Sequence, residues 1–226
     1  ADLYVIGNAL SRGNKCVEEI LNKNFPYKSG PEMLGDIIKD RFVIAVSGTH
    51  GKTTTSFMIA KIFQSLGMDI GYLIGGISPD FSFSAKIGSD EIFVIEADEY
   101  DSAFFDKRSK FIHYSPNILL INNIEFDHAD IFNDLDEIKK QFHHLLKIIP
   151  SSGKIVLFNH DKNALDVINK GCWADIIGIN GDKSKASFDL SSSTIKFDGN
   201  SVNINDLPFY GSHNNLNAAA AIISAA

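Results

Sequence analysis

The feature that most constrains the fold is a glycine-rich loop enclosed between an apolar run and an amphipathic segment. Residues 41–46 (RFVIAV) are almost continuously apolar, which is typical of a parallel strand covered on both faces. The sequence SGTHGKTTT follows at residues 47–55. The next apolar positions, 59, 62, 63 and 66, have helical spacing. A strand, a glycine-rich loop and a helix in this order predict a phosphate-binding loop.

The residue types in this loop suit a nucleotide. Gly48 and Gly51 let backbone N–H groups close around phosphate oxygens, and the helix N-terminus adds partial positive charge. Lys52 can reach the β- and γ-phosphates, and Thr53 can place its hydroxyl on Mg²⁺. The strict G-x-x-x-x-G-K-[ST] pattern is not matched, because Val46 stands where its first glycine belongs. The flanking strand and helix favour phosphate binding over a chance glycine-rich turn.

Two polar segments follow further predicted strands. EADEYD (residues 96–101) comes after the strand at 92–95, and NNIEFDHAD (residues 122–130) comes after the strand at 118–121. Ligands bind at the carboxyl ends of strands in an open parallel sheet, so both segments are expected at the phosphate-loop edge. Carboxylates there suit Mg²⁺, although a solvated acidic loop explains EADEYD equally well. The flanking aspartates favour His128 as a ligand rather than a structural histidine.

The last polar segment, GSHNNLN (residues 211–217), precedes a predicted helix that begins near Asn214. Asn214 and Asn217 lie three residues apart and share a helix face. Their amides could read an adenine edge, but helix capping by asparagine is the simpler interpretation.

A basic run, DKRSK at residues 106–110, interrupts the acidic chain. The default interpretation is a solvated loop, and contact with an anionic substrate is the alternative.

The order of the segments predicts an α/β fold. Strands alternate with helices up to residue 180, which indicates βαβ units and a mostly parallel sheet flanked by helices. Short alternating runs follow, and Asp198-Gly199 is a hairpin signal, so we also expect a small antiparallel element. Residues 1–40 are too few for a domain and are expected to be the tail of one, ahead of a P-loop domain at 41–226.

Charge and composition exclude several classes. The 28 acidic residues outnumber the 21 basic ones, giving a net charge of −7, which argues against a nucleic-acid partner. No apolar run reaches about 18 residues, so no membrane span is expected. The N-terminus lacks the basic region of a signal peptide. Two cysteines cannot build a disulfide framework, so we expect a cytoplasmic protein.

Taken together, SGTHGKTTT, EADEYD, NNIEFDHAD and GSHNNLNAAAA resemble, in order and approximate spacing, the motifs of the Mur ligase family. These ATP-dependent enzymes build the peptidoglycan precursor. The stretches EADEYDSAFFDKRSKFIHYSP, NNIEFDHADIF and GNALSRGN are similar to one branch. That branch joins the murein tripeptide L-Ala-γ-D-Glu-meso-diaminopimelate to UDP-N-acetylmuramate in peptidoglycan recycling. Its sister, which adds L-alanine, tends to have Ser at the position of Tyr100 and lacks FFDKRSKF.

The resemblance implies ATP and Mg²⁺ as cofactors and a role for each matching residue. The catalytic residues would be Lys52, Glu96 and His128, and the metal ligands would be Thr53, Glu96 and His128. ATP would contact a larger set: Gly48, Thr49, His50, Gly51, Lys52, Thr53, Thr54, Asn214 and Asn217. In the family, the muramyl carboxylate becomes an acyl phosphate, which the incoming amine converts to an amide.

The chain departs from the family pattern in its extent. The family has three domains, so residues 1–40 would be the C-terminal part of a Rossmann-like domain that binds the UDP substrate. The C-terminal domain would be missing, and we expect these residues alone to bind nucleotide weakly and to ligate nothing. Several relatives carry a carbamylated lysine after the DH motif, but none of Lys139, Lys140 and Lys147 aligns securely.

Three alternatives remain. An L-alanine-adding ligase differs in its amine substrate. A folylpolyglutamate synthase-like ligase shares the phosphate-loop domain, but the EADEYD and SHNNLN forms disfavour it. A non-catalytic nucleotide-binding module would need only the phosphate loop, and His128 as a second metal ligand disfavours it.

Overall fold

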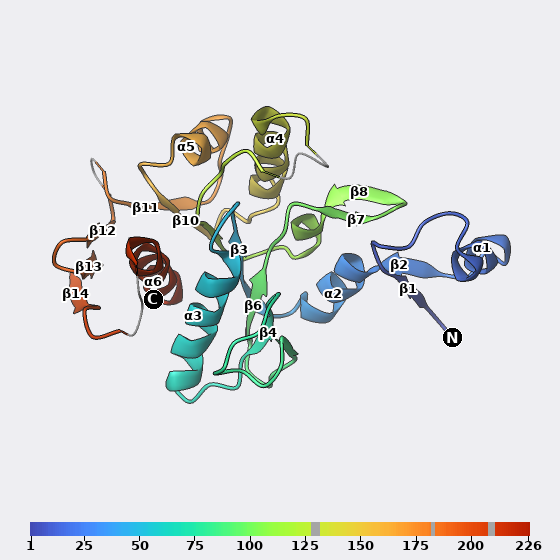
Figure 1. Ribbon diagram of the computed structural model, residues 1–226, viewed down its shortest axis with the longest axis horizontal. Helices are drawn as coiled ribbons and strands as arrows, with labels where there is room; N and C mark the ends of the chain where they lie inside the picture. Colours follow the sequence, from blue (N-terminus) through green and yellow to red (C-terminus); the bar gives the residue numbers. More distant parts are fainter. Residues whose placement is uncertain (128–131, 182–183, 208–210) are drawn as a thin grey trace.

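A single large sheet forms the centre of the molecule. The structure, a computed structural model, describes residues 1–127, 132–181, 184–207 and 211–226. The sheet is ten-stranded and mostly parallel (Figure 1). Its parallel part consists, in spatial order, of β11 (Asp175–Ile179), β10 (Lys154–Phe158), β9 (Ile118–Ile121), β3 (Phe42–Ser47), β6 (Ile92–Glu96) and β4 (Gly71–Leu73). The predicted α/β class is confirmed.

Helices bury both faces of this sheet (Figure 1). One face carries α3 (Lys52–Ser65) and α6 (Ser212–Ala225), and the other carries α4 (Leu135–Leu146) and α5 (Lys162–Asn169). Successive strand residues point to opposite faces. Val46 therefore packs with α3 and α6, whereas Ala45 packs on the α4 side. Burial on both faces explains why β3 is apolar without interruption.

The predicted antiparallel element extends the same sheet. Its strands are β12 (Ala186–Asp189), β13 (Thr194–Phe197) and β14 (Asn200–Asn203). β12 joins β11 in parallel through Ala186 and Ile179. Asp198 and Gly199 both have positive φ, 48° and 78°, which fits the predicted two-residue hairpin turn. At the opposite edge, β5 (Ala85–Lys86) pairs antiparallel with β4.

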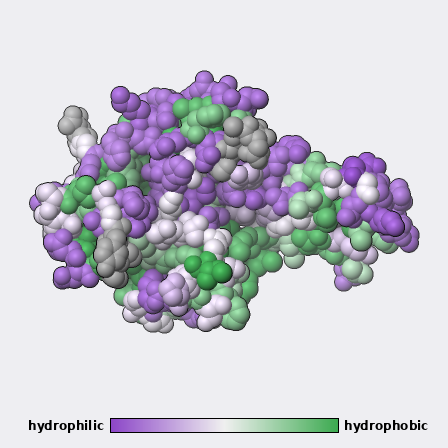
Figure 2. Space-filling view, in the orientation of Figure 1, coloured by the Kyte–Doolittle hydropathy of each residue, from purple (hydrophilic) through white to green (hydrophobic). Residues whose placement is uncertain are grey.

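The first residues form a unit of their own beside the large sheet. We call residues 1–29 the N-terminal unit; it comprises β1 (Tyr4–Ile6), α1 (Lys15–Asn22) and β2 (Tyr27–Ser29). The two strands pair in parallel as a separate sheet. The unit lies at one side of the body (Figures 1 and 2). Helix α2 (Gly30–Ile38), capped by Ser29 and with Pro31 in its first turn, leads from it into the body.

The basic run at 106–110 is not the solvated loop that we expected. Two strands, β7 (Asp101–Ala103) and β8 (Asp106–Ser109), form an antiparallel hairpin, and the 3₁₀ helix η1 (Lys110–His113) follows. Neighbouring carboxylates neutralise the cations: Lys107 pairs with Asp101 at 2.7 Å, and Arg108 pairs with Asp106. No described helix has the length and apolarity to cross a membrane.

A cluster of ionisable groups, in which Asp106 and His113 are largely buried and Arg108 is exposed, lies on β8 and η1. Arg108 donates from Nε and Nη2 to the two carboxylate oxygens of Asp106, at 2.9 and 2.8 Å. His113 Nε2 lies 3.0 Å from Asp106 Oδ2 and 3.1 Å from Ser102 Oγ. The hydrogen bonds from Arg108 lower the pKa of Asp106 to about 2. Burial lowers the pKa of His113 below its ordinary value, against the opposing effects of Asp106 and of Glu32 on α2.

We expect two losses of stability as the pH falls. Below about pH 6.5 the unfolded chain protonates His113 while the folded chain resists, so the free energy of unfolding decreases. Below about pH 4 the unfolded chain protonates Asp106 first, so its contribution disappears as the pH approaches 2. Replacing Asp106→Asn should remove this second loss and cost about 1 kcal/mol at pH 7, because solvent screens the exposed Arg108 partner. Urea unfolding at several pH values measures both effects. The exposed Asp40→Asn serves as the control, and an unchanged acid profile in D106N would refute the assignment.

Candidate functional site

The carboxyl ends of the central parallel strands meet at one edge, as the sequence predicts. The phosphate loop after β3 contacts the segment after β9, because Thr49 N–H donates to Asn123 O at 3.0 Å. It also contacts the end of β6, because Thr53 Oγ1 donates to Glu96 Oε1 at 2.9 Å. The segments 47–55, 96–101 and 122–127 therefore surround one region. His128 lies outside the described residues.

Two glycines let the phosphate loop approach its neighbours. Gly48 has φ 129°, and a β-carbon there would lie 2.8 Å from Asn123 O. Gly51 has φ 80°, and a β-carbon there would lie 2.7 Å from Asn122 Nδ2. Gly51 precedes the first turn of α3, which no side chain caps. The backbone N–H groups at that helix end are therefore available to an anion.

Lys52 is folded back onto its own loop. Its Nζ donates to the carbonyl oxygens of Gly48 and Thr49, at 2.7 and 3.3 Å. The same atom lies 3.7 Å from Glu99 Oε2, on a carboxylate that is only 2% exposed. The ammonium group is thus held beside the N–H groups of the loop, where a bound phosphate would lie.

Glu96 differs from the other carboxylates of the EADEYD segment. Asp98 pairs with Lys110 at 3.0 Å, Asp101 pairs with Lys107, and Glu99 faces Lys52. Within the described chain, no cation pairs with Glu96. Instead, its oxygens accept hydrogen bonds from the Thr53 hydroxyl and from Gly75 N–H, at 2.9 and 2.8 Å.

A carboxylate beside a hydroxyl fits Mg²⁺, which takes hard oxygen ligands. Glu96 and Thr53 are therefore the described residues that could hold the metal. No three His, Cys, Asp or Glu side chains of the described ranges gather closely enough to form a metal site.

Two asparagines that the sequence reading did not assign hold the phosphate loop. Asn122 Nδ2 donates to His50 O and Thr55 Oγ1, at 3.2 and 3.0 Å, and lies 3.5 Å from Asn217 Oδ1. Asn123 Oδ1 accepts from His50 N–H at 2.8 Å. Their position directly after a predicted strand was the signal that could have identified them. Asn122 Oδ1 is buried and has no hydrogen-bond partner in the described structure.

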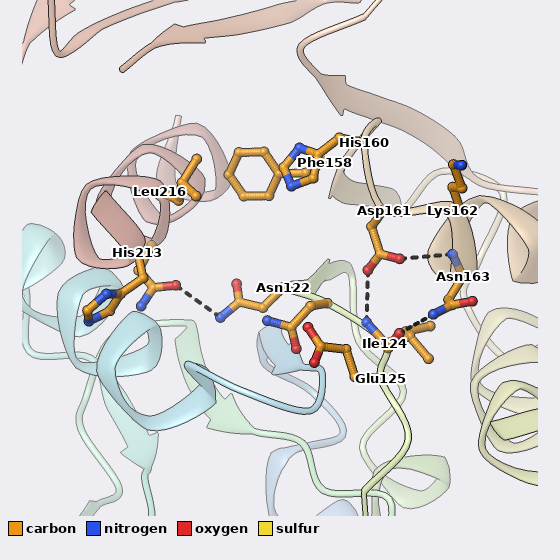
Figure 3. A pocket seen from close by; sticks show the side chains of 12 residues that line it. Asn122, Ile124, Glu125, Phe158, His160, Asp161, Lys162, Asn163, His213 and Leu216 are labelled. Atoms are coloured by element: carbon orange, nitrogen blue, oxygen red, sulfur yellow. Dashed lines mark hydrogen bonds between the residues drawn. The ribbon is translucent and has the colours of Figure 1, made fainter. Parts of the chain in front are cut away.

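A pocket of about 430 Å³ opens beside this loop (Figure 3). Phe158 and His160 lie on one side of it, and Asn122 and Glu125 lie on the other (Figure 3). Its volume falls within the range of small-molecule sites. The lining comes from the segments after β9 and β10 and from α6: Asn122, Asn123, Ile124, Glu125, Phe158, His160, Asp161, Lys162, Asn163, His213, Leu216 and Asn217.

The two asparagines of α6 are placed differently. Asn217 lines the pocket, whereas Asn214 is absent from the lining that the structure describes. Capping by Asn214, our simpler interpretation, is wrong. The helix begins at Ser212, and Gly211 is its N-cap residue. Asn214 therefore lies inside the first turn rather than ahead of it.

The start of α5 fixes one wall of the pocket (Figure 3). Asp161 Oδ1 caps α5 by accepting from the N–H groups of Asn163 and Ala164. Its Oδ2 accepts from Ile124 N–H at 2.8 Å, and Asn163 Nδ2 donates to Ile124 O at 2.7 Å. Both backbone groups of Ile124 are thus hydrogen-bonded to the start of α5.

Of the three lysines considered for carbamylation, Lys139 donates to Asp166 Oδ2 at 2.8 Å.

The fold and the site define an α/β protein with a glycine-rich loop between a strand and a helix at the carboxyl edge of a parallel sheet. Residues 46–225 match the Mur ligase middle domain, and the chain belongs to the Mur ligase family. The resemblance drawn from the sequence motifs is thereby confirmed.

Named relatives and a solved structure agree with this membership. The chain is 48% identical to UDP-N-acetylmuramate–L-alanyl-γ-D-glutamyl-meso-2,6-diaminoheptandioate ligase of Escherichia coli (strain K12), over 99% of the chain and 50% of that protein. It is 33% identical to UDP-N-acetylmuramate–L-alanine ligase of Clostridium botulinum (strain Langeland), over 98% of the chain and 49% of that protein. The chain thus spans about half the length of these relatives.

The crystal structure of UDP-N-acetylmuramate:L-alanyl-γ-D-glutamyl-meso-diaminopimelate ligase from Neisseria meningitides is also similar. It is 41% identical, with a TM-score of 0.90, and the match covers 100% of this chain and 74% of that one.

The substitution Gly51→Ala should have two effects on the site, backbone strain and a steric clash of the new β-carbon with its neighbours. Gly51 and Gly67 have nearly equal φ, 80° and 82°, but a β-carbon at Gly67 meets nothing within 4 Å. Both alanines should cost about 1–2 kcal/mol of stability through left-handed strain. Only G51A should also displace Asn122 and Asn217 and weaken nucleotide binding at least about tenfold. Urea unfolding and calorimetric titration of both variants measure these effects, and equal nucleotide affinities would contradict the prediction.

Proposed function

We propose that the full-length protein is a cytoplasmic, ATP-dependent amide ligase of peptidoglycan recycling. It joins L-Ala-γ-D-Glu-meso-diaminopimelate to UDP-N-acetylmuramate. The observation that carries the ATP-dependent step is the hydrogen bond from Thr53 Oγ1 to Glu96 Oε1, at 2.9 Å. Thr53 directly follows Lys52 in the sequence. A hydroxyl, an acid from the neighbouring strand and a loop lysine are the parts that phosphoryl transfer requires.

Each of these residues has a role in binding the phosphates. The N–H groups at the start of α3 and the Lys52 ammonium bind the phosphate oxygens of ATP. Thr53 and Glu96 hold Mg²⁺, and we keep His128 as a third ligand. Mg²⁺ supplies charge neutralisation on the phosphates when it is bound. Glu96 suits this role because the other carboxylates of its segment face lysines.

The adenine base occupies the 430 Å³ pocket beside the loop. Two observations support this placement. Asn122 and Asn217 line the pocket, and their side-chain amides can bond the edge of a base. The rings of Phe158 and His160, with centroids 5.4 Å apart, offer the base an aromatic surface. Asn217 lies in the lining, and Asn214 stays a predicted contact.

The reaction then proceeds in two balanced steps. The carboxylate of UDP-N-acetylmuramate attacks the γ-phosphorus of ATP, and ADP leaves with the electron pair of the broken P–O bond. The amine of the tripeptide attacks the resulting acyl phosphate through a tetrahedral intermediate, loses a proton, and expels inorganic phosphate. Lys52 stabilises the charge of the transferred group, and the held carboxylate and amine gain from proximity.

The division into domains follows the family. Residues 1–40 form the C-terminal part of the Rossmann-like domain that binds the UDP substrate, and residues 41–226 form the central ATP-binding domain. A C-terminal domain supplied by the same polypeptide completes the active site. The separate pairing of β1 with β2 supports this division.

The choice of amine substrate rests on the named relatives. Identity is 48% to the tripeptide ligase and 33% to the L-alanine ligase over nearly the same share of the chain. The full-length protein is supplied with Mg-ATP and UDP-N-acetylmuramate, together with either the tripeptide or L-alanine. Phosphate release only with the tripeptide supports the proposal. Release only with L-alanine identifies the sister ligase, and nucleotide binding without release in either mixture identifies a non-catalytic module.

Lys52→Ala should lower kcat/KM for ATP by about 10²–10³-fold, because the transferred phosphoryl group loses a cation. Lys61→Ala on the same helix is the matched control. Lys61 is half exposed and pairs with Asp80 at 3.0 Å, and surface pairs of this kind contribute little. Steady-state phosphate release measures both variants. Comparable rates in K52A and K61A would remove Lys52 from the mechanism.

Glu96→Gln should raise the Mg²⁺ concentration needed for half-maximal nucleotide binding at least about tenfold, because a charged ligand is lost. Asp101→Asn should leave it nearly unchanged, since Lys107 already neutralises Asp101. Titration of Mg²⁺ at fixed nucleotide separates the two. Equal shifts in E96Q and D101N would mean that the acidic segment acts only through its summed charge.

A further inference from the structure

The tip of the β7–β8 hairpin has an unusual composition. Its two-residue loop, between Ala103 and Asp106, is Phe104-Phe105. Tight hairpin turns favour Gly, Asn and Asp, so turn geometry does not account for two aromatic residues. Their contacts do. Both rings pack on the small core of the N-terminal unit, and Phe105 meets Tyr27 edge-to-face with ring centroids 4.9 Å apart.

This contact joins the N-terminal unit to the body. The unit's buried apolar residues in the described structure are Ile6, Val17 and Ile20. Helix α1 has 8 residues, and each strand of its sheet has 3. In the described structure, Phe104 and Phe105 are the residues from beyond the unit in this apolar cluster, so the hairpin tip provides the apolar contact between the unit and the body.

The base of the same hairpin is joined to the acidic segment of the candidate site. Lys110 N–H donates to Tyr100 O at 2.8 Å, and Phe111 N–H donates to Asp98 O at 3.3 Å. Lys110 Nζ also donates to Asp98 Oδ2 at 3.0 Å. This segment begins at Glu96, which bonds the Thr53 hydroxyl of the phosphate loop.

The hairpin between these two ends is internally braced. Ser102 Oγ donates to Arg108 O at 2.8 Å, across the two strands. Ser109 Oγ donates to Gln141 Oε1 of α4 at 3.1 Å. With the Asp106, Arg108 and His113 cluster already described, these bonds tie the hairpin to itself and to the body. In Figure 1 the hairpin projects from the body towards β1 and β2.

We propose that the β7–β8 hairpin sets the position of the N-terminal unit relative to the phosphate loop, with Phe104 and Phe105 as positioning residues. The inference deepens the proposed function and rests on it for one consequence. If the domain that contains the N-terminal unit holds the UDP substrate, the hairpin determines how that substrate's carboxylate meets the γ-phosphate. Displacement of the unit should therefore impair binding of the UDP substrate while leaving ATP binding intact.

The test compares the double variant Phe104→Ala/Phe105→Ala with the wild type, both as full-length proteins. Phe83→Ala is the matched control, because Phe83 is a phenylalanine that is 72% exposed. Phe104→Leu/Phe105→Leu is the conservative rescue, since leucine keeps most of the apolar volume. Hydrogen–deuterium exchange by mass spectrometry follows residues 4–29 and the segments of β3 and α3. Kinetics measure kcat and KM for UDP-N-acetylmuramate, and titration measures the Kd for ATP.

In the alanine double variant, we expect amide exchange in residues 4–29 to accelerate at least about tenfold while β3 and α3 stay protected. KM for UDP-N-acetylmuramate should rise at least about tenfold, with a Kd for ATP within about twofold of the wild type. The leucine variant should restore most of the wild-type exchange protection and most of the wild-type KM, and F83A should match the wild type.

Two results would overturn the inference. Unchanged exchange in residues 4–29 would show that the rings do not hold the unit. Faster exchange with unchanged KM and kcat would show that they stabilise it without positioning the substrate. If the wild-type protein ligates neither amine, the proposed function fails, and the exchange arm still decides whether the hairpin fixes the unit.

Discussion

The site depends on the close packing of the phosphate loop against the segment after β9. Gly48 and Gly51 approach Asn123 and Asn122 so closely that a β-carbon at either glycine would clash. The backbone of the loop is held at the same time, because Thr49 and His50 N–H groups donate to Asn123. The loop conformation is thus set by the protein itself, which spares a ligand the cost of ordering it. The parallel order β9-β3-β6 makes this possible, because β3 has a neighbour on each side whose carboxyl end reaches the same edge.

Periodicity in the sequence was enough to predict the framework and the meeting of the strand ends, but not the roles within the acidic segment. A run such as residues 92–95 is recognisable because two buried faces require apolar residues throughout. By contrast, EADEYD presents four chemically similar carboxylates. Three of these carboxylates each face a lysine: Lys52, Lys107 or Lys110. The fourth, Glu96, accepts a hydrogen bond from the Thr53 hydroxyl instead. Lys52 is far from that segment in the chain, so this sorting emerges only from the fold. The predicted start of α6 was wrong for a local reason, because Gly211 and not Asn214 is the N-cap residue.

The β7–β8 hairpin was missed because the partners of its aromatic residues lie far from it in the sequence. A strand with one buried face usually shows alternating apolar residues. Here the strand residues are largely charged, and the apolar residues, Phe104 and Phe105, sit at the turn, where they pack on the N-terminal unit. The charges are satisfied within the hairpin or by the adjacent acidic residues. Strand propensity measures how a side chain packs against its neighbours. A charged segment therefore forms a strand when those neighbours complement its charge.

The proposed function requires a polyanion to bind at an edge rich in carboxylates, in a chain that is acidic overall. Local compensation, rather than net charge, permits this binding. Glu99 is 2% exposed and lies 3.7 Å from Lys52, and removing one member of a buried pair leaves an uncompensated charge. Lys52 meanwhile bonds two neutral carbonyl oxygens of its own loop. Exchanging these for phosphate oxygens replaces neutral acceptors with anionic ones, and charge-assisted bonds are about twice as strong. Under the proposed function, Lys52 would thus neutralise the buried Glu99 carboxylate and also donate to a nucleotide phosphate.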